Sequence, residues 1–141
     1  MNNYSSSRFE VGVDEAGRGS LAGPVTAAAV ILPKNYKNES LDDSKKLSNT
    51  KRLELKKIIE DEALDYAVYF VSSNTIDRIN ILNSTIKAMH GAINKLKIEP
   101  EFILVDGNKF LPYKNISHEC IIKGDSKYQN IAAASILAKT Y

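Results

Sequence analysis

The sequence predicts a mixed α/β fold in which a five-stranded sheet carries helices on both faces. Five short runs, apolar throughout or alternating in polarity, have the length and composition of strands, at 9–13, 25–32, 64–71, 102–105 and 116–122. Longer segments with apolar residues at helical spacing lie between and after these runs. The 141 residues, of which 43% are hydrophobic and 26% charged, fit one globular domain.

The first two strands are expected to pair with each other. Residues 9–13 alternate between apolar and other side chains, whereas residues 25–32 are nearly all small or β-branched, which is typical of a well-buried strand. The link between them is short and rich in glycine, so an antiparallel pair is predicted. The polar residues 1–8 are expected to be a flexible N-terminal tail outside a domain that spans 9–141.

Three helices are predicted, at 50–62, 81–97 and 131–139. Ser48 or Asn49 can cap the first helix. The apolar stripe of this helix consists of Leu55, Ile58 and Ile59. The second helix has a longer stripe, formed by Leu82, Ile86, Met89, Ile93 and Leu96. The third helix is rich in alanine, which has the highest helix propensity.

The segments between the helices complete the order of elements. Residues 102–105 follow a long helix and are apolar on both faces, which predicts a central strand parallel to a neighbour. Residues 34–46 are polar and charged, so we expect a loop there. A short helical turn is expected at 73–79, after the third strand.

Composition excludes several classes of protein. Cys120 is the only cysteine, so neither an internal disulfide nor a four-cysteine zinc site can form. No apolar run reaches the roughly 20 residues that span a bilayer, and the first eight residues lack the apolar core of a signal peptide. We therefore expect a cytoplasmic protein. The net charge of +2 is too small to identify a partner.

Acidic residues follow three of the predicted strands, as Asp14-Glu15, Asp106 and Asp125. Functional side chains of an α/β sheet gather at strand ends, so these four carboxylates are candidates for one site. A ligand set made only of oxygen suits Mg²⁺ or Mn²⁺ and not zinc, and two such ions about 4 Å apart form the phosphoryl-transfer site of many nucleases. Each acid taken alone could equally be a turn or capping residue.

The adjacent pair of acids sets a geometric condition, because consecutive residues of a strand point to opposite faces. Asp14 and Glu15 can serve one site only if the strand breaks between them. Gly17 and Gly19 follow closely and make such a break easy.

Five blocks of the sequence, in order, resemble the bacterial ribonucleases HII of the type 2 ribonuclease H family. The blocks are Val13-Asp14-Glu15-Ala16-Gly17-Arg18-Gly19 with Leu21-Ala22-Gly23-Pro24-Val25, Asp43-Ser44-Lys45-Lys46-Leu47-Ser48, Val105-Asp106-Gly107-Asn108, Lys123-Gly124-Asp125-Ser126-Lys127 and the alanine-rich residues 131–139. The resemblance implies a ribonuclease H-like fold and an endonuclease that hydrolyses the RNA strand of RNA/DNA hybrids. It also implies incision 5′ of ribonucleotides embedded in duplex DNA, as in ribonucleotide and primer removal during DNA repair.

The resemblance further implies which residues do this work. Its catalytic and metal-binding residues carry over as Asp14, Glu15, Asp106 and Asp125, which would hold two Mn²⁺ or Mg²⁺ ions when substrate is bound. The implied partners are RNA/DNA hybrids and duplex DNA that contains ribonucleotides. The protein is expected to act as a monomer and not to bind a membrane.

Substrate contacts carry over to two other blocks. Gly17-Arg18-Gly19 matches the turn with which the family senses ribose. A protein tells RNA from DNA by the 2′-hydroxyl, which a backbone free of Cβ atoms can approach closely. Lys45 matches a lysine that contacts substrate phosphate, and Lys46 adds charge beside it. Without the resemblance, the lysines would be a solvated loop and the glycines a tight hairpin.

The sequence departs from the family at its C-terminus. Members continue past residues 131–139 with further helical sequence, which carries a tyrosine that stacks at the RNA–DNA junction. Tyr141 lies too early to match that tyrosine. We therefore expect a C-terminally shortened member whose last helix is cut short, and an inactive shortened form stays open as an alternative.

Other functions compete with the nuclease. A non-catalytic nucleic-acid-binding module could use the lysines alone to bind phosphates. These lysines are Lys45, Lys46, Lys109, Lys114, Lys123 and Lys127. A transposase or integrase core would share the acids but lack the Gly17-Arg18-Gly19 turn. A dinucleotide-binding loop is disfavoured, because Gly17, Gly19 and Gly23 are spaced one residue too widely and a strand follows where a helix should begin.

Three further residues are expected to be structural. His118 and Cys120 would share one face of a strand, and such an isolated pair is more often packing than a zinc site. Ser135 lies in an apolar helix and is expected to hydrogen-bond to the backbone.

Overall fold

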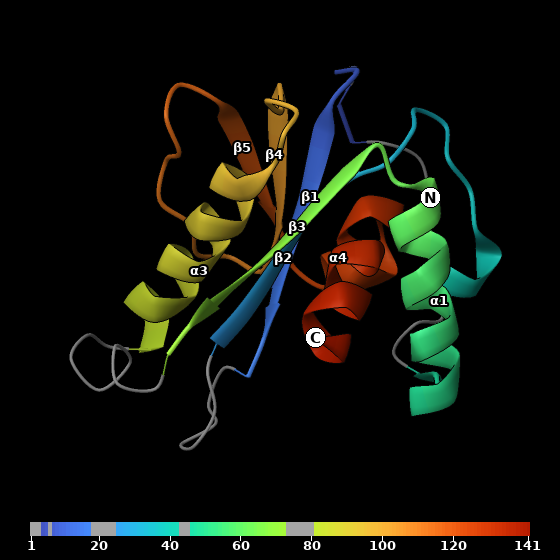
Figure 1. The fold of residues 1–141 in the computed structure, drawn as a ribbon. Helices are drawn as coiled ribbons and strands as arrows, with labels where there is room; N and C mark the ends of the chain where they lie inside the picture. The colour runs from blue at the N-terminus through green and yellow to red at the C-terminus, as the bar shows by residue number, and fades with distance from the viewer. Residues whose placement is uncertain (1–3, 6, 18–24, 43–45, 73–80) are drawn as a thin grey trace.

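A five-stranded mixed sheet lies at the centre of the fold (Figure 1), with its strands in the order β3-β2-β1-β4-β5. The computed structural model describes residues 4–5, 7–17, 25–42, 46–72 and 81–141. The strands are β1 (Glu10–Ala16), β2 (Val25–Ile31), β3 (Asp65–Val71), β4 (Phe102–Asp106) and β5 (Ser117–Ile121). β1 pairs with β2, and β2 with β3, in antiparallel fashion, while β4 runs parallel to both β1 and β5. The predicted mixed sheet, its antiparallel first pair and its parallel fourth strand are thus confirmed.

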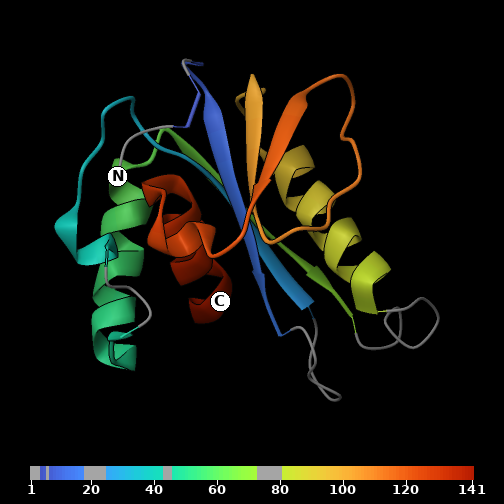
Figure 2. The same ribbon diagram turned by 180° about the vertical axis from the view of Figure 1, so that it is seen from behind.

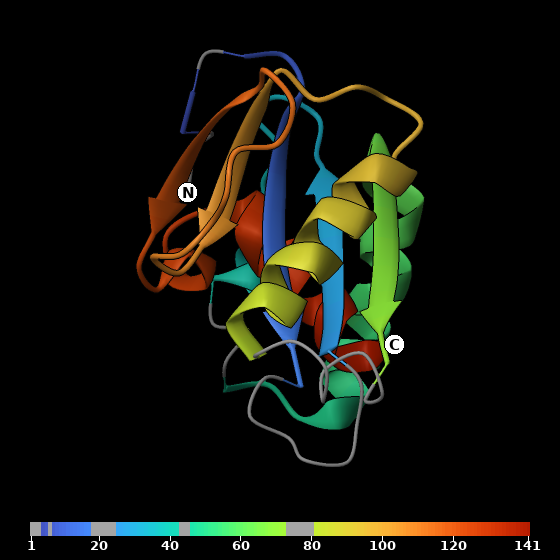
Figure 3. The ribbon, with the colours of Figure 1, turned by 90° about the vertical axis from the view of Figure 1, so that its left-hand side faces the viewer.

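Helices cover both faces of this sheet, as predicted. They are α1 (Asn49–Glu62), α3 (Ile81–Lys95) and α4 (Gln129–Thr140), with the short 3-10 helices η1 (Glu39–Leu41) and η3 (Gly124–Ser126). One face is covered by α3, which crosses β3, β2 and β1 (Figure 3). The other face is covered by α4, with α1 on its outer side (Figure 2). Within the described ranges, no helix has the length and apolar character needed to cross a bilayer.

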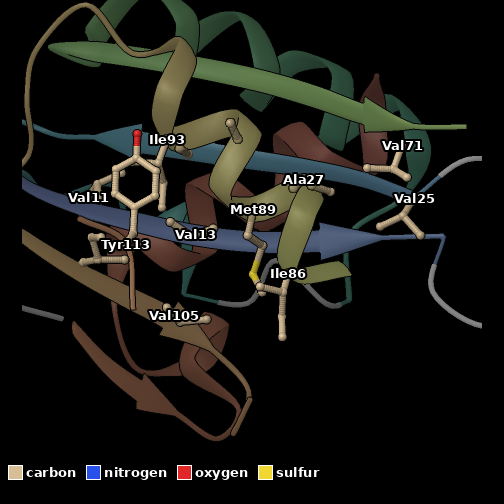
Figure 4. Packing of buried hydrophobic residues seen from close by; sticks show 14 of the residues in the cluster. Val11, Val13, Val25, Ala27, Val71, Ile86, Met89, Ile93, Val105 and Tyr113 are labelled. Atoms are coloured by element: carbon tan, nitrogen blue, oxygen red, sulfur yellow. The ribbon is translucent and has the colours of Figure 1, made fainter. Parts of the chain in front are cut away.

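A hydrophobic core fills the space on each side of the sheet. Beneath α3, Val11 and Val13 of β1 pack with Met89 and Ile93 of the helix (Figure 4). On the other side, Ala28 and Val30 of β2 pack with apolar residues of α4, α1 and η1. The alternation of β1 and β2 side chains between two cores explains why both strands are buried along most of their length.

The structure corrects three details of the predicted elements. β1 continues to Ala16 and does not end at residue 13, because Glu15 and Ala16 still pair with residues of β2. The strand therefore does not break between Asp14 and Glu15. Ile58 is 36% exposed, although Leu55 and Ile59 are buried as predicted. The loop at 34–46 contains η1, whose Leu41 is fully buried.

The other element boundaries lie close to those predicted. Ser48 is the N-cap of α1, and its hydroxyl accepts the Lys51 N–H at 3.3 Å. α4 begins at Gln129, two residues before the predicted start. The helical turn expected at 73–79 lies outside the described residues.

Gly12 lets α4 approach β1 closely. A Cβ built on Gly12 would lie 2.5 Å from the carbonyl oxygen of Asn130 and 2.6 Å from the Ile131 nitrogen. Both atoms belong to the backbone of the first turn of α4, so no change of rotamer could make room. The missing side chain at Gly12 therefore sets the distance between β1 and α4.

Two residues of the N-terminal segment contact the sheet. The Ser5 N–H and hydroxyl donate to Glu10 Oε1 at 2.6 and 2.8 Å, and Asn130 Nδ2 donates to Glu10 Oε2 at 2.7 Å. The Tyr4 ring stacks on Phe102, with ring centroids 5.7 Å apart. These donors satisfy the buried Glu10 carboxylate at the start of β1.

Candidate active site

The parallel strands β1 and β4 bring two acids together. Val13 and Val105 pair in register and belong to the core beneath α3. The next residue of each strand, Asp14 and Asp106, therefore points to the other face of the sheet, which α4 covers. Asp14 is only 6% exposed, and Asp106 is half-buried. Two carboxylates thus lie close together in a partly desolvated setting.

A third acid is joined to this pair through the backbone. The Gly124 N–H donates to Asp106 Oδ1 at 2.8 Å, and Asp125, 5% exposed, follows directly in η3. Lys123, just before them, has a φ of 56°, in the left-handed region. This conformation is uncommon for a residue with a side chain, and here it turns the chain from β5 into η3. The turn therefore fastens the segment of Asp125 to Asp106.

The surroundings of Asp14 disfavour a negative charge there. Burial raises the pKa of Asp14 well above its ordinary value, and the charges of Asp106 and Glu15 raise it further. The Glu15 N–H, which donates to Asp14 Oδ1 at 2.8 Å, and the Ser135 hydroxyl lower this pKa. A bound cation would relieve both the desolvation and the repulsion.

Ser135 was missed as a site residue by the sequence analysis. It is 1% exposed on α4, and its hydroxyl hydrogen-bonds to Asp14 rather than acting only on the helix backbone. The close contact of α4 with β1 at Gly12 brings it within reach. A hydroxyl within the alanine-rich run of a buried helix was the available signal, but its partner lies more than 100 residues away.

Glu15 lies on the other face of the sheet from Asp14 and Asp106. Because β1 is regular up to Ala16, the alternation of its side chains directs Glu15 toward the face that α3 covers. Among the described residues, no three His, Cys, Asp or Glu side chains lie close enough to hold a metal ion between them. The carboxylates offer only oxygen atoms, which Mg²⁺ and Mn²⁺ prefer as ligands. The Asp14–Asp106 pair can also supply negative charge to such a cation.

The predicted substrate-binding residues are only partly described. Gly17 is exposed directly after β1, with a φ of 85° that favours glycine. Lys46 is exposed just before α1. Arg18, Gly19 and Lys45 lie outside the described residues.

His118 and Cys120, two of the residues expected to be structural, pack at the α3 side of β5. The His118 ring meets the Phe110 ring edge to face at 4.9 Å, and Phe110 meets His90 in the same way at 5.0 Å. Cys120 packs against the core beneath α3, and burial raises the pKa of its thiol. These contacts agree with a packing role for His118 and Cys120.

Comparison with known proteins gives a consistent result. The family model described as Ribonuclease HII matches residues 11–141. A protein of Christiangramia forsetii named Ribonuclease HII is 60% identical over 141 residues, which make up 100% of this chain and 71% of that protein. A protein of the same name from Parabacteroides distasonis is 60% identical over 134 residues, covering 95% of this chain and 67% of that protein.

A solved structure shares the fold. The ribonuclease H2 of Pyrococcus horikoshii matches with a TM-score of 0.79 and 28% identity, over 93% of this chain and 70% of that chain. The predicted ribonuclease H-like fold is thereby confirmed. Since the family model covers nearly the whole sequence and the two curated relatives are 60% identical to it, the chain belongs to the ribonuclease HII family of endonucleases.

Proposed function

We propose that this protein hydrolyses the RNA strand of RNA/DNA hybrids and incises duplex DNA on the 5′ side of embedded ribonucleotides. The observation that carries the proposal is the proximity of Asp14 and Asp106, which follow the paired Val13 and Val105 on two parallel strands. Burial and the neighbouring carboxylates disfavour negative charge at Asp14, and a divalent cation bound beside the pair would relieve that cost. Family membership supplies the class of substrate. Such an activity would remove ribonucleotides and primers from DNA in the cytoplasm, with the protein acting as a monomer.

We assign catalysis and metal binding to Asp14, Glu15, Asp106 and Asp125. Two Mn²⁺ or Mg²⁺ ions held there would supply an activated water and neutralise charge on the phosphate. The protein itself orients the carboxylates: the Ser135 hydroxyl and the Glu15 N–H hold Asp14, and the Gly124 N–H holds Asp106. For Glu15 to join them, the end of β1 would have to turn when a cation binds.

We assign recognition of the sugar and phosphates to the loops that flank this site. Gly17, Arg18 and Gly19 would contact the 2′-hydroxyl and the nearby backbone, which separates RNA from DNA. The exposed Gly17, in a left-handed conformation directly after β1, supports this role because its backbone is accessible beside the acids. Lys45 and Lys46 would bind phosphate.

The test is cleavage of an end-labelled DNA duplex that contains one ribonucleotide, with an all-DNA duplex as the matched control. The 141-residue chain is assayed beside the same chain extended with the C-terminal part of the Christiangramia forsetii relative. The extension is included because the 141-residue chain spans only 71% of that protein. We expect a cut 5′ of the ribonucleotide that leaves a 3′-hydroxyl and requires Mn²⁺ or Mg²⁺.

Asp106→Asn separates catalysis from binding in this assay. The variant should lose cleavage and still bind the duplex. If the extended wild-type chain binds but does not cut with Mn²⁺ present, the protein is a nucleic-acid-binding module and the nuclease proposal is wrong. If only the extended chain cuts, the 141-residue form is inactive by itself.

A further inference from the structure

Two exposed lysines have a backbone conformation that suits few residues. Lys114 and Lys123 have φ values of 49° and 56°, in the left-handed region. Asn35 is the other described residue with a side chain in this region, and asparagine tolerates it. Lysine is less tolerant, because its Cβ approaches the following carbonyl oxygen in this conformation. A residue that is kept in a costly conformation raises the question of what its side chain contributes.

The side chain of Lys114 has partners within the fold, whereas that of Lys123 has none in the part of the chain that the structure describes. Lys114 Nζ lies 3.8 Å from Glu99 Oε1 and 5.5 Å from the centre of the Tyr113 ring. Among the described residues, the Lys123 ammonium has no ion pair, no hydrogen bond and no aromatic ring beside it. Its charge is therefore available to a bound molecule.

The two lysines lie at opposite ends of β5. Lys114 precedes this strand and Lys123 follows it. Because β5 runs parallel to β4 and Ile121 pairs with Asp106, the end of β5 that leads to Lys123 is the end at which Asp106 lies. Lys114 is at the other end, near Glu99, which precedes β4. One left-handed lysine is therefore beside the candidate site, and the other is remote from it.

The backbone of Lys123 is held close to Asp106. The next residue, Gly124, donates its N–H to Asp106 Oδ1 at 2.8 Å. Standard bond lengths place Lys123 Cα about 2.4 Å from that nitrogen, and hence no more than about 5 Å from the carboxylate oxygen. A Cβ on Gly124 would lie 2.5 Å from Ile131 Cδ1, so the turn also packs closely against α4. The base of the Lys123 side chain is therefore fixed beside the acids.

We propose that Lys123 is a further substrate-binding residue, whose ammonium binds a phosphate of the cleaved strand next to the scissile phosphate. The inference rests on the proposed function and adds a phosphate contact at the turn between β5 and η3. A nucleic-acid strand carries one phosphate per about 3.4 Å of helix axis, so a strand cleaved beside Asp106 has further phosphates near this turn. The flexible four-carbon stem of a lysine lets the ammonium meet one of them.

Lys123→Gly separates this role from a structural one. Glycine adopts the left-handed conformation without steric cost, so the variant loses the ammonium and is expected to keep the turn. We expect its melting temperature to equal that of wild type or to rise by up to about 3 °C. Lys123→Asn also tolerates the conformation and serves if the glycine variant loosens the turn.

Two more variants complete the set. Lys123→Arg keeps the positive charge and should bind substrate within about two-fold of wild type. Lys114→Gly is the matched control, because it removes a lysine of the same conformation at the other end of β5. Its affinity for substrate should equal that of wild type.

Binding is measured with a fluorescent RNA/DNA hybrid in EDTA over a range of salt concentrations. Cleavage is measured separately in Mn²⁺, with whichever of the two chain lengths cuts. For Lys123→Gly we expect Kd and KM to rise about 3- to 10-fold and the slope of log Kd against log salt to decrease in magnitude by about 1, as for one lost phosphate contact. We expect kcat to stay within about two-fold of wild type.

Neutral methylphosphonate linkages locate the contact. The phosphates on either side of the scissile one are replaced singly in the cleaved strand. At the phosphate that Lys123 binds, the replacement should raise KM for wild type and leave KM unchanged for Lys123→Gly, because that variant has already lost the interaction.

The inference is overturned if Lys123→Gly has the Kd and salt slope of wild type, or if Lys114→Gly weakens binding as much. It is also overturned if kcat falls at constant KM, if no methylphosphonate position distinguishes the variant from wild type, or if Lys123→Gly and Lys123→Asn both lower the melting temperature by more than about 3 °C. A wild-type chain that neither binds nor cuts the hybrid refutes the proposed function itself. Cleavage by wild type and an unchanged Lys123→Gly variant refute only the role of Lys123.

Discussion

Adding one methyl group at Gly12 tests whether the candidate site depends on the close spacing of α4 and β1. In Gly12→Ala the new Cβ would stand 2.5 Å from Asn130 O and 2.6 Å from Ile131 N. Comfortable contacts between such atoms are about 3.5 Å, so helix and strand must separate by about 1 Å. Overpacking of this kind costs about 1–3 kcal/mol, and because only backbone atoms are involved we expect the upper end of that range.

For a chain of this length, each kcal/mol lowers the melting temperature by about 2–4 °C. Thermal unfolding followed by circular dichroism should therefore show a fall of about 5–10 °C. The same displacement moves Ser135 away from Asp14, so kcat/KM at a temperature where the variant is folded should also fall. Ser117→Ala, at an exposed position of β5, is the control and should change neither quantity. A melting temperature for Gly12→Ala within about 1 °C of wild type would refute the steric argument.

Three further predictions concern the charge at Asp14. Ser135→Ala removes a donor from a buried carboxylate, so Mn²⁺ affinity measured by electron paramagnetic resonance should fall several-fold, while stability changes by no more than about 1 kcal/mol; unchanged affinity would remove Ser135 from the site. Because the folded state raises the pKa of Asp14 above its ordinary value of 3.8, it binds that proton more tightly than the unfolded chain does. The free energy of unfolding without metal should therefore decline as pH rises from about 4 through the raised pKa. Urea unfolding in EDTA should show the stability of Asp14→Asn rising relative to that of wild type over this range. Parallel pH curves of stability for the two proteins would contradict this. Saturating Mn²⁺, at about 100 times its Kd, should stabilise wild type by about 2.7 kcal/mol and Asp14→Asn by less, as melting curves with and without EDTA would reveal.

Much of the fold could be predicted because its elements are encoded by local patterns. The apolar run at 102–105 and the helical stripe that includes Met89 and Ile93 have a periodicity that few other structures would satisfy. The extension of β1 to Ala16 could not be predicted in this way, because Asp14 and Glu15 interrupt the apolar pattern and the pairing is imposed by β2. The exposure of Ile58 likewise depends on what its neighbours leave uncovered.

The candidate site divides along the same line. The acids were visible in the sequence because their type and their place after predicted strands are local features. The groups that hold them were not visible: Ser135 reaches Asp14 only after α4 docks on β1, and the Gly124 N–H is a backbone group without a sequence signal of its own. Outside the site, Gln129 likewise hydrogen-bonds to Asn38, 91 residues away, and the interactions of a polar side chain at such a distance follow from tertiary structure alone.

The neighbouring position of β1 and β4 also has a consequence for the order of folding. These strands pair although about 90 residues separate them, so a long loop must close before their contacts form, which is slow compared with joining consecutive strands. β1, β2 and β3 follow one another in the chain and can pair while β4 is still being synthesised. Asp14 and Asp106, which repel each other without a cation, then meet in a late step, together with the docking of α4. A nascent chain would thus assemble the candidate site only near the end of its folding, after most of the sheet already exists.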